Sequence, residues 1–425
     1  MRFSSMLVGA VLALSFSTAS ANNDRMIDVI VSLENGGPAV EHASNRAVAR
    51  DVANSVGIQP TRVYGAALTG FAASVPENRL DALRNDPRVA SVNMDGEVRI
   101  AQGNCPHCGG GGGDGDDQTV PWGIERVGSQ DNANTGAGIN VYILDTGIDP
   151  DHDDLNVAGG YAVENCRGGG CSADWDDGHG HGTHVAGTVA ALDNDIDVVG
   201  VAPDAILWSV KVLSDSGSGS RSGVIEGIDW VTQQAIDLGE PVVSNMSLGG
   251  SGSKTGECTD DGFVGDDSYH EALCNARNAG VITVAAAGND GGDAADAVPA
   301  AYDDAVITVS ATEVGDDWTS WSNWGDDSAD WTSNNSAPVA IAAPGAAILS
   351  TSTGGGTETM SGTSMAAPHV AGGVALILAS SNESQDSSAF FNARSILLDS
   401  AEDTGSFSNT SGNPHDEDFL DARGL

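Results

Sequence analysis

Lysine is almost absent from this chain. Only Lys211 and Lys254 occur in 425 residues, and 17 basic residues stand against 60 acidic ones, which gives a formal net charge of −43. This large excess of negative charge repels the phosphate groups of nucleic acids, which makes nucleic acid an unfavourable partner. Two explanations for the charge remain: scattered calcium loops, or a surface adapted to high salt, where self-repulsion is screened. We favour salt adaptation.

Long apolar runs are also scarce. The run from Met6 to Phe16 follows Arg2 and precedes three small residues that end at Ala21, a pattern typical of a secretory signal peptide cleaved after Ala21. This run is too short to span a bilayer, and the apolar stretch at 370–379 is shorter still. We therefore predict a secreted, soluble protein that has no membrane partner.

Cysteines number only six, and in an exported chain they indicate disulfides before anything else. Cys166 and Cys171 flank a short glycine turn, whereas Cys258 and Cys274 flank an acidic loop. We predict that each of these two pairs forms a disulfide.

An uneven distribution of charge marks a domain boundary. Residues 22–101 hold eight arginines against ten acidic residues, whereas residues 102–425 hold eight basic residues against fifty acidic ones. At the boundary, Cys105 and Cys108 adjoin a glycine-rich stretch that is typical of a flexible linker. No second CxxC accompanies this pair, so a local disulfide or free thiols are favoured over a zinc or redox site. The predicted division is a signal peptide over 1–21, a small domain over 22–101, a linker over 102–117 and a large domain over 118–425.

The two domains differ in their secondary-structure patterns. In the small domain, strand-like, helical and hairpin patterns alternate up to a final strand over 89–100, which predicts an α+β fold. In the large domain, apolar strand-like runs such as 139–145 and 281–288 alternate with helical runs such as 222–239. This alternation predicts an α/β fold with a mostly parallel sheet and helices on both faces. Functional residues of such sheets gather at the carboxyl ends of the strands.

Two short motifs carry candidate functional groups. YILDTGID (142–149) ends an apolar strand in Asp145, which could be a metal ligand, a helix cap or the orienting carboxylate of a catalytic triad. HGHGTHVAG (179–187) places His179, His181 and His184 just before a helical run. The three histidines suggest zinc, but they match no familiar ligand spacing, so zinc and a structural role stay equally open.

A third motif, SGTSMAAPHVAG (361–372), places three hydroxyls ahead of an apolar helical stretch. A serine is a poor nucleophile unless a histidine accepts its proton and a carboxylate fixes the tautomer of that histidine. The chain supplies Asp, His and Ser in that order, which is one of the known triad arrangements. A serine at the start of a helix also lies beside backbone N–H groups that stabilise an oxyanion.

With these motifs the chain resembles the subtilisin-like serine proteases, over about residues 22–425. DTGID, HGTHVAG and GTSMAAPHVAG carry the resemblance. It implies a serine endopeptidase that acts through an acyl-enzyme, with Asp145 as orienting carboxylate, His181 as general base and Ser364 as nucleophile. VAAAGND (284–290) implies that Asn289 donates to the oxyanion.

The same resemblance gives the remaining polar residues of the motifs structural roles. Ser361 and Thr363 become turn and cap hydroxyls, His184 and His369 become packing histidines, and His179 has no matched role.

Polypeptide substrates are expected to lie extended between two strand edges, in the manner of β-augmentation. Arg221 falls where many relatives carry an aromatic residue in a more distant subsite. The substrate-binding residues implied by the resemblance are Gly217, Ser218 and Gly219 on one edge, Ser247, Leu248 and Gly249 on the other, and Ala286, Ala287 and Gly288 in the first specificity pocket.

A structural calcium site is also implied, because ALDNDIDVVGVAP (191–203) resembles a calcium loop of the family. Oxygen-only ligands suit Ca²⁺. The alternative is an acidic loop that is merely solvated. A second, weaker site of some relatives is not expected, because Ala340 occupies its ligand position. The implied ligands are Gln118, Asp154, Leu192, Asn194, Ile196 and Val198.

The small domain resembles the inhibitory propeptide of the family. The resemblance implies a ferredoxin-like α+β domain that guides folding, inhibits its own protease and is removed near residues 100–117. The large domain would then be a three-layer α/β sandwich of the subtilisin-like type, acting as a monomer. Two alternatives remain: a catalytically silent calcium-binding or adhesive module on the same fold, and a zinc hydrolase that uses the three histidines.

Overall fold

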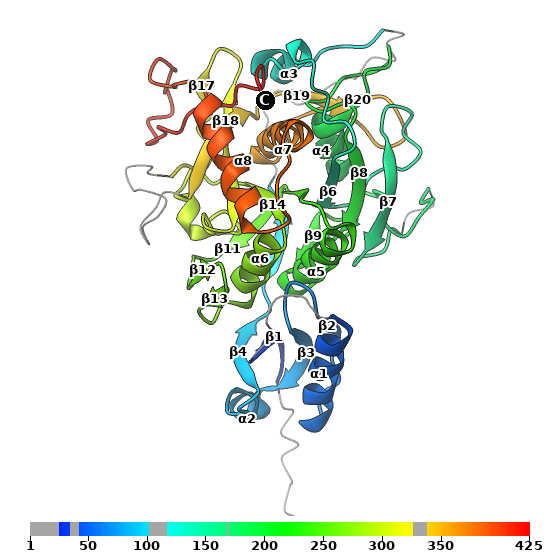
Figure 1. Ribbon diagram of the computed structural model, residues 1–425, viewed down its shortest axis with the longest axis vertical. Helices are drawn as coiled ribbons and strands as arrows, with labels where there is room; N and C mark the ends of the chain where they lie inside the picture. The colour runs from blue at the N-terminus through cyan, green and yellow to red at the C-terminus, as the bar shows by residue number, and fades with distance from the viewer. Residues whose placement is uncertain (1–24, 35–41, 102–116, 168–169, 326–337) are drawn as a thin grey trace, which may run out of the picture.

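The computed structural model describes residues 25–34, 42–101, 117–167, 170–325 and 338–425, and Figure 1 shows a small domain beneath a larger one. The predicted signal peptide and the Cys105–Cys108 pair lie outside the described residues. The fold class predicted from the sequence is confirmed for both domains.

The large domain is built on an eight-stranded sheet. Neighbouring strands run parallel, except for β17, which is antiparallel to β16. In spatial order the strands are β17 (Asp317–Trp318), β16 (Val306–Glu313), β14 (Val281–Ala286), β10 (Val242–Met246), β6 (Asn140–Asp145), β8 (Ile206–Lys211) and β7 (Val157–Ala162), with β18 (Val339–Pro344) also paired to β16.

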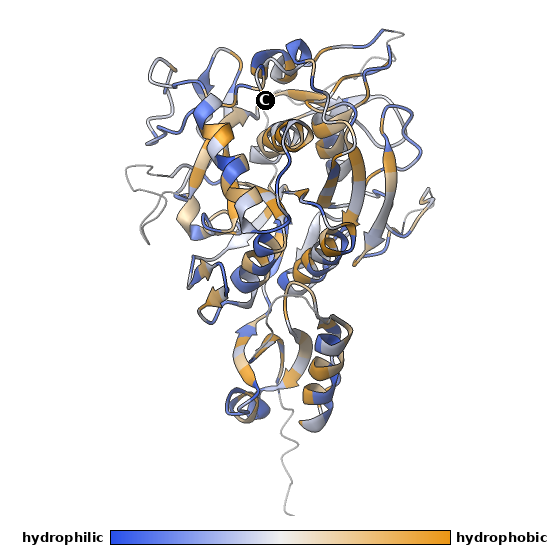
Figure 2. Ribbon diagram, in the orientation of Figure 1, coloured by the Kyte–Doolittle hydropathy of each residue, from blue (hydrophilic) through white to orange (hydrophobic). Residues whose placement is uncertain are grey.

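Helices cover both faces of this sheet, because its side chains alternate between two apolar cores. In β6, Val141 and Ile143 pack into the core on the α4 and α7 side, whereas Tyr142 and Leu144 pack into the core on the α5 and α6 side. Figure 2 shows the apolar residues along these central strands. The helices are α3 (Trp122–Val127), α4 (His181–Ala190), α5 (Arg221–Leu238), α6 (Ser268–Asn278), α7 (Thr363–Ser380) and α8 (Ser387–Ser400).

Helix α7 is long and apolar enough to cross a membrane by length and composition alone. However, 89% of it is buried inside the protein, so it is the central core helix of the large domain. Figure 1 shows it enclosed by other elements.

Short elements and two disulfides complete the large domain. The predicted pairs Cys166–Cys171 and Cys258–Cys274 both form disulfides. The short elements are β9 (Ser218–Ser220), β11 (Leu248–Ser251), β12 (Glu257–Thr259), β13 (Gly262–Val264), β15 (Ala297–Val298), β19 (Ile348–Thr351), β20 (Thr357–Met360), η2 (Ser129–Asp131) and η3 (Ala294–Asp296).

The small domain is an antiparallel sheet with helices on one face. Val31 and Phe71 of the sheet pack against the helices, whereas Ile30 and Ala72 on the opposite face pack into the core that includes α5 and α6. The sheet order is β2 (Arg62–Tyr64), β3 (Gly70–Pro76), β1 (Met26–Leu33) and β4 (Val89–Met94), and the helices are α1 (His42–Ser55), η1 (Glu77–Arg79) and α2 (Leu80–Arg84).

The strand predicted over 89–100 divides into two elements. Only β4 belongs to the sheet of the small domain. The second element, β5 (Glu97–Ile100), leaves that sheet and enters the large domain between β11 and β9. The last residues of the small domain therefore lie against the predicted active site.

Candidate active site

Strand β5 occupies a cleft between the two strand edges predicted to bind substrate. It is antiparallel to both: Val98 pairs with Gly219, and Ile100 pairs with Leu248. Arg99 pairs with Ser218 on one side and with Gly249 on the other. This extended strand shows how a peptide fits the cleft by adding to a sheet.

At the end of β5, two further backbone hydrogen bonds hold the chain. The Ile100 N–H donates to the carbonyl oxygen of Gly217 at 3.0 Å, and the Ala101 N–H donates to that of Ser247 at 3.2 Å. Ala101 then borders a cavity of about 290 Å³, whose lining includes Ala286, Ala287, Gly288 and Asn289. All nine predicted substrate-binding residues therefore border this strand or the cavity at its end.

Asp145 and His181 meet where β6 ends and α4 begins. The His181 Nδ1 lies 2.8 Å from the Asp145 Oδ1, and both side chains are fully buried. The Thr146 N–H donates to the same oxygen at 2.7 Å. Because the carboxylate accepts the Nδ1 proton, Nε2 is left as the basic nitrogen of the neutral ring.

Ser364 lies in the first turn of α7, against the end of the bound strand. Its Oγ lies 2.5 Å from the carbonyl oxygen of Ala101 and 3.0 Å from that of Ser247. Its backbone N–H points to the same Ala101 oxygen at 3.4 Å. Among the described residues, His181 Nε2 has no hydrogen-bond partner. With the strand in place, the serine hydroxyl therefore bonds to a peptide carbonyl instead of the imidazole.

Asn289 lines the same cavity as Ala101 and presents an unused donor. Its Oδ1 accepts hydrogen bonds from the Thr363 N–H at 2.9 Å and the Thr363 hydroxyl at 3.1 Å, which fixes the orientation of the amide. Its Nδ2 is buried, with no acceptor in the described part of the chain. An unpaired buried donor is costly, so its presence indicates a position kept for an acceptor.

The cap role predicted for Thr363 is wrong: Gly362 is the N-cap residue of α7 and has no side-chain cap bond, and the Thr363 hydroxyl instead orients the Asn289 amide. The two residues lie 74 positions apart, so the sequence gives no signal of this contact.

The other histidines of the motifs serve packing. His184 Nε2 bonds to backbone carbonyls of Ile348 and Glu358, and His369 Nδ1 bonds to the carbonyl of Met365. Burial lowers the pKa of His184 to about 3 and that of His369 to about 4, so both rings are neutral.

A zinc site gains no support from the geometry. The rings of His179 and His181 are 6.4 Å apart. Among the residues whose placement is described, no group of three closely spaced potential metal ligands includes His179, His181 or His184.

Arg221 reaches across the entrance of the cleft. Its backbone N–H donates to the Gly96 carbonyl at 2.8 Å, and its guanidinium donates to the Ser251 carbonyl on the opposite edge. Where relatives were expected to carry an aromatic residue, this chain therefore has a cation that joins both edges.

The six residues predicted to bind calcium lie together. The carbonyl oxygens of Leu192, Ile196 and Val198 lie 2.6, 3.4 and 3.0 Å from the Gln118 Nε2, so they converge on one point. The side-chain oxygen of Asn194 accepts from the Ile196 N–H at 3.1 Å.

Asp154 supplies the carboxylate of this cluster. It is fully buried; one oxygen accepts from the Val198 N–H at 3.2 Å, and the other has no partner among the described residues. Burial raises the pKa of Asp154 to about 7. A buried carboxylate with a spare oxygen beside converging carbonyls fits a hard cation such as Ca²⁺.

Comparison with protein families matches both domains. The profile described as the subtilase family matches residues 136–417, and the profile described as peptidase inhibitor I9 matches residues 29–101. The first match covers more than half of the chain.

Individual relatives agree with these matches. An extracellular serine proteinase from Thermus sp. (strain Rt41A) is 38% identical over 332 residues, which cover 76% of this chain and 69% of that protein. Subtilisin DY from Bacillus licheniformis is 41% identical over 267 residues, which cover 61% of this chain and 85% of that protein. A solved structure of a cold-adapted subtilisin-like serine proteinase has a TM-score of 0.56 at 34% identity and covers 71% of this chain and 97% of that one.

Proposed function

The chain belongs to the subtilase family and is a serine endopeptidase, and we propose that it is a secreted, self-processing zymogen that acts through Asp145, His181 and Ser364. One observation carries the proposal: the Asp145 carboxylate bonds to the His181 ring, and the Ser364 hydroxyl bonds to the peptide carbonyl at the end of the strand that occupies the cleft. The first 21 residues would direct export, since one relative of this chain carries the name extracellular serine proteinase.

Substrate binding follows from β5. A polypeptide would add as a strand between β9 and β11, so backbone hydrogen bonds give affinity for an extended chain without selecting its sequence. Selection would come from the cavity beside Ala101, whose small lining residues leave room for a side chain.

In the acylation step, rotation of the Ser364 side chain would bring its hydroxyl to His181 Nε2. The imidazole takes the proton as Oγ attacks the peptide carbonyl, and Asp145 stabilises the imidazolium. The negative oxygen that forms would accept hydrogen bonds from the Ser364 N–H and from the unused Asn289 Nδ2.

The tetrahedral intermediate then collapses to an acyl-enzyme, which water hydrolyses. The imidazolium gives its proton to the leaving amine as the peptide C–N bond breaks, which leaves an acyl-Ser364 ester. Water then attacks the ester with His181 again as base, and the carboxylate product and free serine hydroxyl are released.

Ser364→Ala tests the function most simply. The wild-type chain should hydrolyse casein and be labelled at Ser364 by a fluorophosphonate, whereas S364A should do neither, because the bond-forming oxygen is gone. Ser361→Ala is the matched control, since its hydroxyl accepts the Ala347 N–H at the base of the β19–β20 hairpin, and this variant should still be labelled.

A correctly folded wild-type chain that neither cleaves casein nor takes the label would favour the catalytically silent calcium-binding or adhesive module. Activity that survives S364A and is lost with a zinc-selective chelator would favour the zinc hydrolase.

We propose that the small domain inhibits the enzyme as an intramolecular propeptide, held by an anchor on α5. Asp229 is 2% exposed; its Oδ1 accepts from the N–H groups of Gly65, Ala66 and Ala67 at 2.9, 2.5 and 2.8 Å. Its Oδ2 forms an ion pair with Arg46 at 2.7 Å. The carboxylate thus satisfies four donors of the small domain.

Asp229→Asn should weaken this anchor, because an amide has one acceptor oxygen and would turn an NH₂ group toward a donor. In the full-length chain, activity should then appear sooner after processing, since the cleaved domain dissociates about 10-fold faster or more, a loss of about 1.4 kcal/mol. The delay between cleavage on a gel and casein hydrolysis is the measurement.

Asp237→Asn is the control for this variant, because Asp237 is an exposed carboxylate of the same helix that accepts a hydrogen bond from Gln233 and forms no hydrogen bond or ion pair with any residue of the small domain that the structure describes. An unchanged delay in D229N would contradict the anchor.

We propose that Ca²⁺ binds at the cluster of Gln118 and Asp154 with a structural role, remote from any chemical step. The Gln118 amide would turn its oxygen toward the ion, since amide oxygen and nitrogen exchange places by a flip. The orphan oxygen of Asp154 would gain a partner, which offsets the cost of its burial.

Calcium should raise the melting temperature by about 5 °C at a concentration 100-fold above its dissociation constant. Asp154→Asn should abolish most of this shift. Asp153→Asn, at an exposed neighbour, should retain it. An equal shift in both variants would contradict the site.

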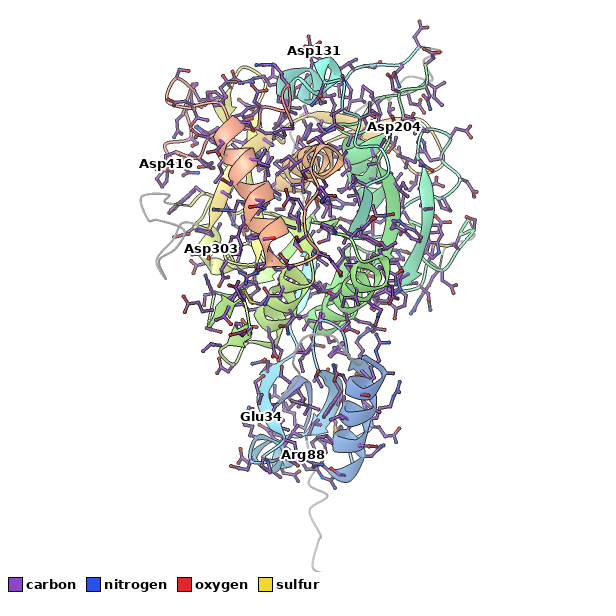
Figure 3. All side chains as sticks on the ribbon, viewed as in Figure 1. Glu34, Arg88, Asp131, Asp204, Asp303 and Asp416 are labelled. Carbon is purple, nitrogen blue, oxygen red and sulfur yellow. A yellow bond between two sulfur atoms is a disulfide. The ribbon has the colours of Figure 1, made fainter. Side chains whose placement is uncertain are left out.

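We also propose that the acidic surface is adapted to salt. Asp131, Asp204 and Asp416 are three exposed acidic residues of the large domain labelled in Figure 3. When the same melting experiment is repeated in molar salt with calcium held constant, the melting temperature should rise, because salt screens the repulsion among such groups. Equal stability in dilute buffer would contradict this proposal.

A further inference from the structure

A buried carboxylate that is not part of the predicted triad bonds to the residues adjacent to Asp145 and His181. Asp177, four residues before His181, is 6% exposed. Its Oδ1 accepts hydrogen bonds from the Thr146 hydroxyl at 2.8 Å and from the N–H groups of His179 and Gly180, both at 2.9 Å. Its Oδ2 accepts from the Thr183 N–H at 2.9 Å and the Thr183 hydroxyl at 2.8 Å. One carboxylate therefore receives five hydrogen bonds.

Three of these bonds fix the start of α4. The N-cap residue Gly180 has no side chain, so it cannot satisfy the free N–H groups of the first helical turn. Asp177 supplies the acceptor instead, through Gly180 and Thr183. The orientation of His181, the first residue of the helix, is set by this turn.

A fourth bond ties the helix to the end of β6. The Thr146 hydroxyl donates to Asp177 and accepts from the Gly182 N–H at 3.0 Å. Thr146 follows Asp145, and Gly182 follows His181. The start of α4 lies so close to the segment after β6 that a Cβ atom at Gly182 would be 2.0 Å from the Gly147 carbonyl oxygen. Asp177 and Thr146 thus form a brace that holds the catalytic carboxylate and imidazole at bonding distance.

Charge gives the brace a second effect. The amino end of a helix carries partial positive charge, which opposes the formation of an imidazolium on its first residue. The Asp177 carboxylate lies at this helix end and offsets that charge. Three other titratable groups lie near the brace. Lys211 donates to the Thr146 carbonyl and pairs with Asp215 at 2.8 Å, and the Asp176 carboxylate accepts from Ser172 and from the Asp177 N–H. The Asp149 N–H donates to the Thr183 hydroxyl, while its carboxylate accepts from the N–H groups of Asp151 and Gly354. His179 contributes its backbone N–H to Asp177.

We propose that Asp177 is a positioning residue for proton transfer: it holds His181 against Asp145 through Thr146 and stabilises the imidazolium by its charge. The inference rests on the proposed function. It gives a positioning role to a carboxylate that contacts neither the substrate nor the reacting atoms.

Asp177→Asn is the principal test, because it keeps the shape but removes the charge and one acceptor oxygen. The concentration of active enzyme is determined by fluorophosphonate titration. For D177N, kcat should then fall about 10- to 100-fold while KM changes less than about two-fold, because a displaced His181 ring slows the chemical step but leaves the substrate-binding strands β9 and β11 unchanged. The acidic limb of the kcat/KM profile should move to lower pH, because a neutral neighbour no longer favours the protonated ring.

Asp176→Asn is the matched control. Asp176 is 7% exposed and adjacent in sequence, and among the described residues its carboxylate bonds only within its loop, so its variant should keep the wild-type kcat and pH profile. A lower melting temperature in D177N with unchanged kcat and an unmoved acidic limb would overturn the proposal, because a helix cap alone predicts that result.

A second pair of variants decides the matter if D177N does not fold or process. Thr146→Val removes only the hydroxyl link of the brace, whereas Thr146→Ser retains it. A fall in kcat for T146V that T146S restores supports the brace, and equal kcat values for the two variants overturn it. If the wild-type chain itself takes no label at Ser364, the proposed function fails; if it is labelled and these variants behave like it, only the present inference fails.

Discussion

The structure depends on the antiparallel pairing of residues 97–101 with both edges of the cleft. Leu248 and Gly249 bond to one side of this segment, and Ser218 and Gly219 bond to the other. Because both edges register on the same strand, the carbonyl of its last residue reaches the Ser364 hydroxyl and backbone N–H together. The same pairing would account for both self-inhibition and the proposed orientation of a substrate.

The large domain makes that geometry possible because its three proposed catalytic residues lie at the ends of rigid secondary-structure elements. Asp145 ends a strand buried on both faces, whereas His181 and Ser364 begin helices packed on that sheet. Side chains at such ends lose little further freedom when they act, which is the basis of a preorganised site. Hydrogen bonds from residues without chemical roles, Thr363 to Asn289 and Thr146 to Asp177, complete the alignment.

The sequence predicts much of this because its strongest signals are local. Alternation of strands and helices gives the α/β class, and three short motifs supply the residues of the proposed triad. Contacts between distant segments cannot be predicted from local patterns. Residues 97–100 form a strand as expected, but nothing in the local sequence indicates that this strand pairs with the segments around Ser218 and Leu248. Asp177 escapes for the same reason, since an acidic residue before a helix is common and only the fold brings Thr146 to it.

The most direct test is to identify the first peptide bond that the chain cleaves in itself. Freshly folded full-length protein would be stopped at early times and analysed by intact mass spectrometry at several protein concentrations. The account predicts a first fragment that ends at Ala101, a partner that begins at Gln102, and a rate independent of concentration, because the Ala101 carbonyl already lies against Ser364. A first cut at any other bond, or a rate proportional to concentration, would contradict it.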